Sequence, residues 1–208
     1  MVFQWFLIFS LIEHAYAKPT AANVPLFETK NTHDDVYENV YFSVSMKKPA
    51  EWYTMTLKEL HLFIPNGTAA FKSHRIVPLF GFSAYRMGSR PDRINANIIG
   101  FVERIAKRTK FHDDCDFFKD NENAFPKMFT LENMSECYPY EINGVKYARK
   151  DLKVKFLDVS ILEQIRFFRS TKSGYLFAFT LTFGESDDIN QLMHAMYTIQ
   201  FSNKSYIL

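Results

Sequence analysis

Alternating apolar side chains over residues 175–183 constrain the fold of this chain more than any other stretch. The two alternating sets are Tyr175, Phe177, Phe179, Leu181 and Phe183, and Leu176, Ala178, Thr180 and Thr182. A period of two in these residue types predicts a β-strand. A second apolar run at residues 161–169 precedes it, and the link at 170–174 has hairpin length, which predicts two paired strands.

A closing helix is predicted directly after this strand. Ser186 and Asp187 follow Gly184, and their side-chain oxygens can cap a helix N-terminus. Apolar side chains then recur at helical spacing, at Ile189, Leu192, Met193 and Met196. A helix laid across a sheet buries both apolar faces. We therefore expect a contact between two sets of side chains, Phe177, Phe179, Leu181 and Phe183 of the strand and Leu192 and Met196 of the helix.

The composition predicts a folded domain without a nucleic-acid partner. Apolar residues make up 47% of the 208 residues and aromatic residues 17%, which is enough for a sizeable core and argues against disorder. The 25 basic and 23 acidic side chains are interspersed and give a net charge of +2. Binding to nucleic acid requires a concentrated basic surface, which this balance does not supply.

The first 17 residues predict a signal peptide. Residues 2–12 are almost wholly apolar, and Ala15-Tyr16-Ala17 supplies a small-x-small cleavage pattern before Lys18. No basic residue precedes the apolar run, so a core strand or helix is the alternative for this segment. The run is too short for a permanent span, and no later stretch is long enough, so the mature protein is expected to have no membrane span. We therefore expect a periplasmic or secreted protein.

The rest of the chain divides into an arm and one domain. Residues 18–50 are punctuated by prolines and predict an N-terminal arm or linker, within which residues 36–46 can pair as a strand or pack loosely. Residues 51–208 are expected to form a single α+β domain. Within its first half, residues 57–64 alternate and predict a strand that ends in turn chemistry. Residues 74–85 predict a second strand, at an edge or with a bulge, because Pro78 has no N–H to donate.

The middle of the domain is more ambiguous. The apolar residues within 94–105 fit both the spacing of a helix and that of a strand, and we favour a strand over residues 95–103. Residues 106–134 are the most polar and irregular part of the chain, with a short helix possible from Asp113 or Asp114. After them, Asn143-Gly144 is a strong hairpin signal between apolar runs, because both residues tolerate positive φ.

Two strands flank this turn, at residues 137–142 and 145–149, and a further strand is predicted at 153–160. The predicted order along the chain is therefore several strands, a polar irregular segment, further strands and a closing helix. That order predicts an α+β fold on a mainly antiparallel sheet.

Three segments resemble the Mog1/PsbP-like family. They are LHLFIP at residues 60–65, EINGVKYARKDL at 141–152 and the closing strand, acidic helix start and final short strand over 174–203. The resemblance covers residues 51–203 and implies an α/β/α sandwich on an antiparallel sheet. It also implies a non-catalytic binding or assembly module, as most members are, and many members are exported. The chain departs from the family in lacking a Trp soon after the Ile-Pro step and in its long Cys-bearing insert, and no family binding residue carries over.

One cluster of groups with chemical potential stands out, at residues 112–116. His112, Asp113, Asp114, Cys115 and Asp116 are consecutive, and such residues rarely converge on a cation without a glycine-bearing loop. A solvated helix start is the favoured interpretation, with a weak cation site and a catalytic group as alternatives. No metal, cofactor or catalytic residue is therefore assigned, and no hydrolase, nucleotide or dinucleotide motif occurs.

Glycosylation triplets occur at three positions, and each matters only in a eukaryotic secretory host. They begin at Asn66, Asn133 and Asn203.

A disulfide between Cys115 and Cys137 is predicted. They are the only two cysteines, and an exported chain meets an oxidising compartment. The segment between them is polar and without clear periodicity, so a covalent tie is a plausible means of holding it. Two buried free thiols are the alternative, and the pairing requires Cα atoms within about 7 Å.

These features predict an exported, non-catalytic binding or assembly module that acts through a protein or envelope partner. A secreted virulence-type factor is one form of such a module. The alternative is a secreted hydrolase or metal-dependent enzyme whose site is built from scattered residues. A cleft with converging carboxylates and histidine would favour the enzyme, and a shallow aromatic surface would favour the binding module.

Overall fold

A computed structural model describes residues 35–39, 41–63, 76–90, 93–104, 114–116, 129–156, 160–170, 175–184 and 186–201. The predicted signal peptide, the link at 171–174, and His112, Asn66 and Asn203 lie outside these ranges. The side chains of Ser186 and Asp187 also lie outside the description, so the predicted helix cap stays a prediction.

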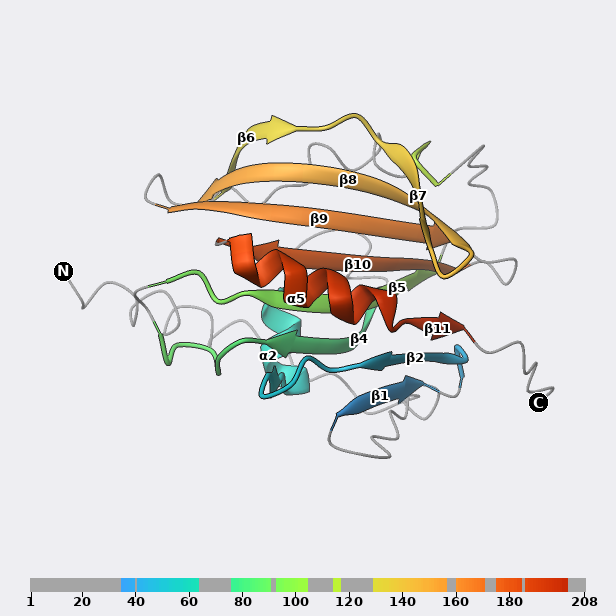
Figure 1. The fold of residues 1–208 in the computed structure, drawn as a ribbon, viewed down its shortest axis with the longest axis horizontal. Helices are drawn as coiled ribbons and strands as arrows, with labels where there is room; N and C mark the ends of the chain where they lie inside the picture. Colours follow the sequence, from blue (N-terminus) through green and yellow to red (C-terminus); the bar gives the residue numbers. More distant parts are fainter. Residues whose placement is uncertain are drawn as a thin grey trace, which may run out of the picture.

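The described residues form an α+β fold dominated by antiparallel sheet (Figure 1). The larger sheet has eight strands in the order β3-β4-β5-β10-β9-β8-β6, and β7 also pairs with β8. Their bounds are β3 Tyr53–Thr54, β4 Ile76–Ser83, β5 Asn97–Arg104, β6 Phe129–Met134, β7 Tyr138–Ile142, β8 Val145–Phe156, β9 Ser160–Ser170 and β10 Tyr175–Phe183. A three-stranded sheet consists of β1 Val36–Asn39, β2 Val44–Lys47 and β11 Gln200–Phe201, and the two helices are α2 Leu57–Leu62 and α5 Ser186–Tyr197.

The predicted closing hairpin and helix are confirmed. β9 and β10 pair antiparallel, with Phe167 opposite Phe179. Because side chains alternate along a strand, Phe179 and its neighbours of the same parity all face α5. They share one core cluster with Leu192 and Met196 of the helix. The chain between β10 and α5 is short, so the helix is forced back across the sheet that it leaves.

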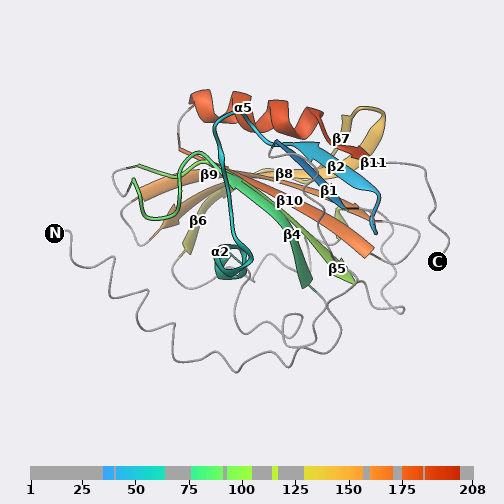
Figure 2. The same cartoon turned by 90° about the horizontal axis from the view of Figure 1, so that it is seen from below.

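The two helices lie on opposite faces of the larger sheet (Figure 2). α5 and the three-stranded sheet cover one face, where Tyr37 and Met46 join the main core. α2 covers part of the other face, where Leu60 packs with Met55 and Ile99. The centre of the sheet is therefore buried on both sides.

The prediction of a strand over residues 57–64 was wrong, because residues 57–62 form helix α2. Thr56 and Glu59 form a reciprocal capping box, in which each side chain satisfies a backbone N–H of the other residue. Leu57 is 63% exposed whereas Leu60 is buried, which fits one face of a helix. A Cβ on Gly81 would meet the side chains of Leu60 and Met55, so the absence of a side chain there lets the helix approach β4.

The strands predicted within residues 74–85 and 94–105 are confirmed as β4 and β5. The β4–β5 register shifts between Pro78 and Phe80, so the predicted bulge is present. β3 pairs with β4 only at Phe82 and Ser83, so among the described strands β4 is outermost at Pro78. The ambiguous segment forms β5, which pairs with β10 along its whole length.

The Asn143-Gly144 hairpin is confirmed, with φ of 52° and 76° at the two residues. The strand that follows is longer than predicted, because β8 runs without a break over residues 145–156. The expectation that residues 106–134 are irregular was wrong at its end, where Phe129–Met134 forms β6 and pairs with β8. A polar strand of this kind is stabilised by its partner, and its own sequence carries little signal of it.

Part of the predicted arm is structured. Within residues 36–47, β1 and β2 form an antiparallel hairpin, and β2 also pairs with β11. Val44 is buried in the main core. The division of the chain into residues 1–17, 18–50 and 51–208 stays a prediction, with the hairpin packed against the predicted domain.

Candidate binding site beside helix α5

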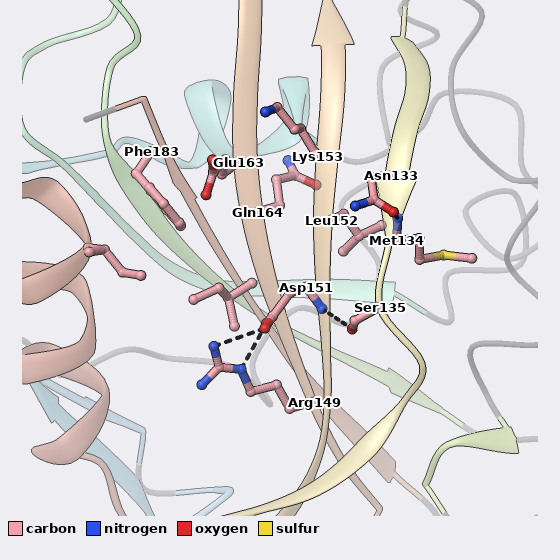
Figure 3. A pocket seen from close by; sticks show the side chains of 12 residues that line it. Asn133, Met134, Ser135, Arg149, Asp151, Leu152, Lys153, Glu163, Gln164 and Phe183 are labelled. Carbon is pink, nitrogen blue, oxygen red and sulfur yellow. Dashed lines mark hydrogen bonds and ion pairs between the residues drawn. The ribbon is translucent and has the colours of Figure 1, made fainter. Parts of the chain in front are cut away.

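A cavity of about 330 Å³ lies between α5 and the outer strands β6, β8 and β9 (Figure 3). Its lining is contributed by β6 and the residue after it, β8, β9, β10 and α5, and consists of Asn133, Met134, Ser135, Arg149, Asp151, Leu152, Lys153, Glu163, Gln164, Ile165, Phe183 and Ile189. Of these, Ile165 and Phe183 are buried, so the floor is apolar, whereas Asn133, Lys153 and Glu163 are exposed and supply polar groups. The cavity is thus an apolar depression with a polar rim, as is usual for small-molecule sites.

Arg149 and Asp151 form an ion pair at one end of the cavity. Arg149 Nε donates to Asp151 Oδ1 at 2.8 Å, and a terminal guanidinium nitrogen donates to Oδ2 at 3.1 Å. The Tyr138 hydroxyl also donates to Oδ2, at 3.0 Å. The side chains of Arg149 and Asp151 are 15% and 39% exposed, so this two-point pair is shielded on the arginine side. Both carboxylate oxygens of Asp151 are therefore already occupied.

Aromatic rings surround the Arg149 guanidinium. Its Cζ lies 4.8 Å from the ring centre of Tyr140 and 5.6 Å from those of Tyr138 and Phe167. The hydroxyls of Tyr140 and Tyr197 are 2.8 Å apart, and Tyr197 is 46% exposed on α5. We refer to Tyr138, Tyr140, Arg149 and Tyr197 as the tyrosine–arginine cluster. It forms a rigid surface that is continuous with the cavity through Arg149.

Arg149 and Tyr138 each keep one ionisation state near neutral pH. Burial lowers the pKa of Arg149, but the hydrogen bonds and charge of Asp151 outweigh burial and raise it above the ordinary value. Burial raises the pKa of Tyr138, and its hydrogen bond to the Asp151 carboxylate raises it further. Arg149 thus stays cationic and Tyr138 stays a neutral donor, so neither exchanges a proton at physiological pH.

Ser135 positions Asp151 from the gap between β6 and β7. The Ser135 N–H donates to the Asp151 carbonyl oxygen, and the Asp151 N–H donates to Ser135 Oγ, both at 2.9 Å. Ser135 thus makes two hydrogen bonds to the Asp151 backbone at the point where the partner of β8 changes from β6 to β7. This fixes the backbone from which the Asp151 carboxylate projects.

The disulfide cysteines and the described part of the 112–116 cluster lie elsewhere. Cys115 and Cys137 are joined in a disulfide with Cα atoms 5.7 Å apart. They pack with Phe168 and Ala178, whose side chains alternate with those facing α5, so the disulfide lies on the opposite face of the sheet. Asp114 accepts a hydrogen bond from the Ser170 N–H at 3.0 Å and is not near the cavity lining.

His194 is exposed on α5 and is not among the residues that line the cavity. Within the described ranges, no group of three or more His, Cys, Asp or Glu side chains is placed to hold a metal ion.

Sequence reasoning did not identify this cavity. Of its lining, Asn133 was named as part of a glycosylation triplet, and Phe183 and Ile189 were named as core residues. The available signal was the charged alternation of Arg149, Asp151 and Lys153, which places three charges on one face of a strand. That pattern is typical of a solvated surface, and the partners that turn it into a cavity come from other strands.

Comparisons with known proteins give structural matches only. No family model and no curated protein matches this sequence. A crystal structure from Bacteroides thetaiotaomicron matches at 11% identity and a TM-score of 0.47, over 80% of this chain and 47% of that one. The solution structure of cyanobacterial PsbP from Synechocystis matches at 12% identity and a TM-score of 0.46, over 88% and 98% of the two chains. The crystal structure of LpqN, described as involved in cell envelope biogenesis of Mycobacterium tuberculosis, matches at 13% identity and a TM-score of 0.38, over 74% and 78%.

The resemblance to PsbP-like proteins in the sequence thus has a counterpart among the structural matches. The chain spans about half the length of the Bacteroides protein. In the part of the chain that the structure describes, no helix has the length and apolarity needed to cross a membrane.

Proposed function

We propose that this protein is a non-catalytic binding module that contacts a protein partner through the tyrosine–arginine cluster. The observation that carries the proposal is the Arg149 guanidinium, held by Asp151 and stacked among aromatic rings beside the exposed Tyr197. Tyrosine and arginine are enriched at the centres of protein interfaces, where rigid side chains lose little entropy on binding. The cluster presents both types in a preformed arrangement.

The chemistry of the site supports binding more than catalysis. Both oxygens of Asp151 accept hydrogen bonds from Arg149 and Tyr138, so the protein's own groups hold this carboxylate in place. Neither histidine nor cysteine is among the residues that line the cavity. A general acid or base needs a pKa near the working pH, and the pKa values of Arg149 and Tyr138 are raised away from it.

The module is proposed to act outside the cytoplasm, in a periplasmic or secreted setting. The Cys115–Cys137 disulfide supports an oxidising compartment, because cytosolic thiols are kept reduced. The apolar segment and the Ala15-Tyr16-Ala17 pattern support cleavage before Lys18. N-terminal sequencing of the protein recovered outside the cytoplasm should begin at or near Lys18, and an intact Met1 on a soluble cytoplasmic protein would contradict this.

The proposed architecture is an α/β/α sandwich on the antiparallel sheet. Its support is the position of α5 and α2 on opposite faces of the larger sheet (Figure 2). In that architecture the cavity opens beside one helical layer, at the outer strands that α5 leaves uncovered.

Site-specific photo-crosslinking tests the binding surface. A photoreactive phenylalanine analogue at Tyr197 should give a discrete protein adduct in the native compartment. The same analogue at Leu57, which is 63% exposed on α2 at the opposite face, is the matched control and should give none. An adduct from Leu57 alone, or from neither position, would contradict the assignment of this surface.

A further inference from the structure

Four side chains of different chemistry form one row across the larger sheet at the cavity. The strand register places Asn133 of β6 opposite Lys153 of β8, Lys153 opposite Glu163 of β9, and Glu163 opposite Phe183 of β10. Figure 3 shows the four in this order, with α5 beyond Phe183. Neighbouring strands are about 4.8 Å apart, so the row presents an amide, an ammonium, a carboxylate and a ring at regular steps.

The polar groups of this row are available to a ligand. The side chains of Lys153 and Glu163 are both exposed, and within the described residues neither side chain makes an ion pair or a hydrogen bond, including with the other. Asn133 uses its Oδ1 to accept the Met134 N–H at 2.8 Å, which leaves its Nδ2 as a donor toward the rim. By contrast, Arg149 and Asp151 in the same cavity satisfy each other. The groups available to a ligand are thus two neighbouring hydrogen-bond donors, on Asn133 and Lys153, followed by one acceptor, on Glu163.

The apolar end of the row continues into the cavity floor. Phe183 and Ile165 are buried, and the half-buried Ile189 of α5 closes that side. A ligand group placed here would lie against these three apolar side chains. Burial of one aliphatic side chain against such a surface is favourable in proportion to the area covered.

We propose that this cavity binds a free α-amino acid with an apolar side chain. The carboxylate of the ligand accepts from Asn133 Nδ2 and Lys153 Nζ, its ammonium donates to the Glu163 carboxylate, and its side chain lies against Phe183 and Ile189. The row thus offers a partner for each of the three substituents that an α-amino acid carries on its α-carbon. This inference concerns the cavity and stands independently of the protein-binding role of the tyrosine–arginine cluster.

Charge complementarity favours this ligand over singly charged ones. A simple anion would meet the Glu163 carboxylate next to its binding groups, and a simple cation would meet Lys153. A zwitterion satisfies both, and the ligand adds no net charge to a rim that holds one charge of each sign. The volume of about 330 Å³ suits one amino acid, since it lies at the small end of the range for ligand sites.

Titration calorimetry on the full chain tests the proposal with four ligands. L-leucine carries both charges and an apolar side chain, leucinamide lacks the carboxylate, N-acetyl-leucine lacks the ammonium, and L-serine lacks the apolar side chain. We expect L-leucine to bind about tenfold more tightly than each of the others, which corresponds to about 1.4 kcal/mol. Equal affinity for leucine and either singly charged analogue, or no binding of leucine at millimolar concentration, would overturn the proposal.

Two variants assign the charges to residues. Lys153→Gln should remove the preference for leucine over leucinamide, and Glu163→Gln should remove the preference over N-acetyl-leucine. The matched control is Glu141→Gln with Lys146→Gln, an exposed pair of the same two types that is also directly opposed across two strands, outside the cavity. If the control changes the ligand preference as much as the cavity variants, the site lies elsewhere.

The comparison of ligands on the unmodified protein remains decisive if a variant fails to fold. Failure of leucine binding leaves the photo-crosslinking result at Tyr197 unaffected, so the two proposals can fail separately.

Discussion

The side-chain amide of Asn143 donates to the carbonyl oxygen of Tyr197 at 2.6 Å and lies 3.4 Å from that of Ile199. Asn143 sits in the β7–β8 turn with φ of 52°, and Tyr197 is the last residue of α5. The last carbonyl groups of a helix have no partner within the helix. The turn of one hairpin thus caps the C-terminal end of a distant helix and fixes the distance between α5 and β8.

Asn143 both adopts the positive φ of the turn and donates to Tyr197. Replacing Asn143 with Gly should remove the hydrogen bond and keep the turn. Glycine tolerates the positive φ of the turn but cannot donate to Tyr197, so the loss is that of one hydrogen bond, about 1 kcal/mol. Chemical denaturation measures the change. An unchanged midpoint would show that water satisfies the helix end equally well.

Breaking the Arg149–Asp151 ion pair should lower the free energy of unfolding by more than is usual for an exposed ion pair. Asp151→Asn leaves the Arg149 guanidinium, whose side chain is 15% exposed, without its carboxylate. We expect a loss of about 1–3 kcal/mol, discounted for the partial exposure of Asp151. Glu163→Gln is the control, because Glu163 is exposed and lacks a partner in the described chain, and it should change stability little. Equal effects of the two variants would contradict a structural role for the pair.

The capping box of α2 predicts a dependence of stability on acid. Burial raises the pKa of Glu59, but hydrogen bonds from the Thr56 N–H and hydroxyl and from Tyr53 outweigh burial and hold it below the ordinary value. A carboxylate whose pKa is lowered on folding stabilises the protein above the unfolded pKa, and this contribution is lost as pH falls through the folded pKa. Glu59→Gln should therefore cost about 0.5 kcal/mol at pH 7, and this cost should disappear as the pH falls through the lowered folded-state pKa of Glu59. Denaturation curves at several pH values measure the difference, and a constant difference would rule out ionisation as its cause.

The disulfide predicts that no free thiol is present. Alkylation of the denatured, unreduced protein should label neither Cys115 nor Cys137, as read by mass spectrometry. The cysteines are 22 residues apart, so replacing both with Ser should cost about 3 kcal/mol in the entropic account of loop closure. Two labels without reductant would contradict the bridge.

Truncation of a buried side chain in the central strand β10 should greatly lower the stability of the protein. Phe179 is fully buried, with rings of Phe177, Phe80 and Tyr147 about it. Phe179→Ala should cost about 3–5 kcal/mol, whereas Leu57→Ala at an exposed site should cost less than about 0.5 kcal/mol. An unchanged unfolding midpoint for Phe179→Ala would show that β10 is not central.

Local chemistry made part of this fold predictable. The period of two over residues 175–183 and the helical spacing after Gly184 each predict one backbone conformation, and both are present. Asn143-Gly144 is equally local, since both residues tolerate positive φ without help from the rest of the chain. In these cases each residue type carries its own preference, and burial by distant partners agrees with it.

Helix α2 depends on both local chemistry and tertiary packing. LKELHL has apolar residues that fit a short strand or one face of a helix, the capping box of Thr56 with Glu59 is a local signal for the helix, and the approach of Leu60 to Gly81 agrees with it. Only the tertiary structure decided the remaining features. β6 forms because β8 extends past the hairpin and offers it a partner. The row of Asn133, Lys153, Glu163 and Phe183 depends on the register of four strands. A register is a relation between segments distant in sequence, so the side-chain pattern of each strand fixes which face it presents, and only pairing fixes what stands beside it.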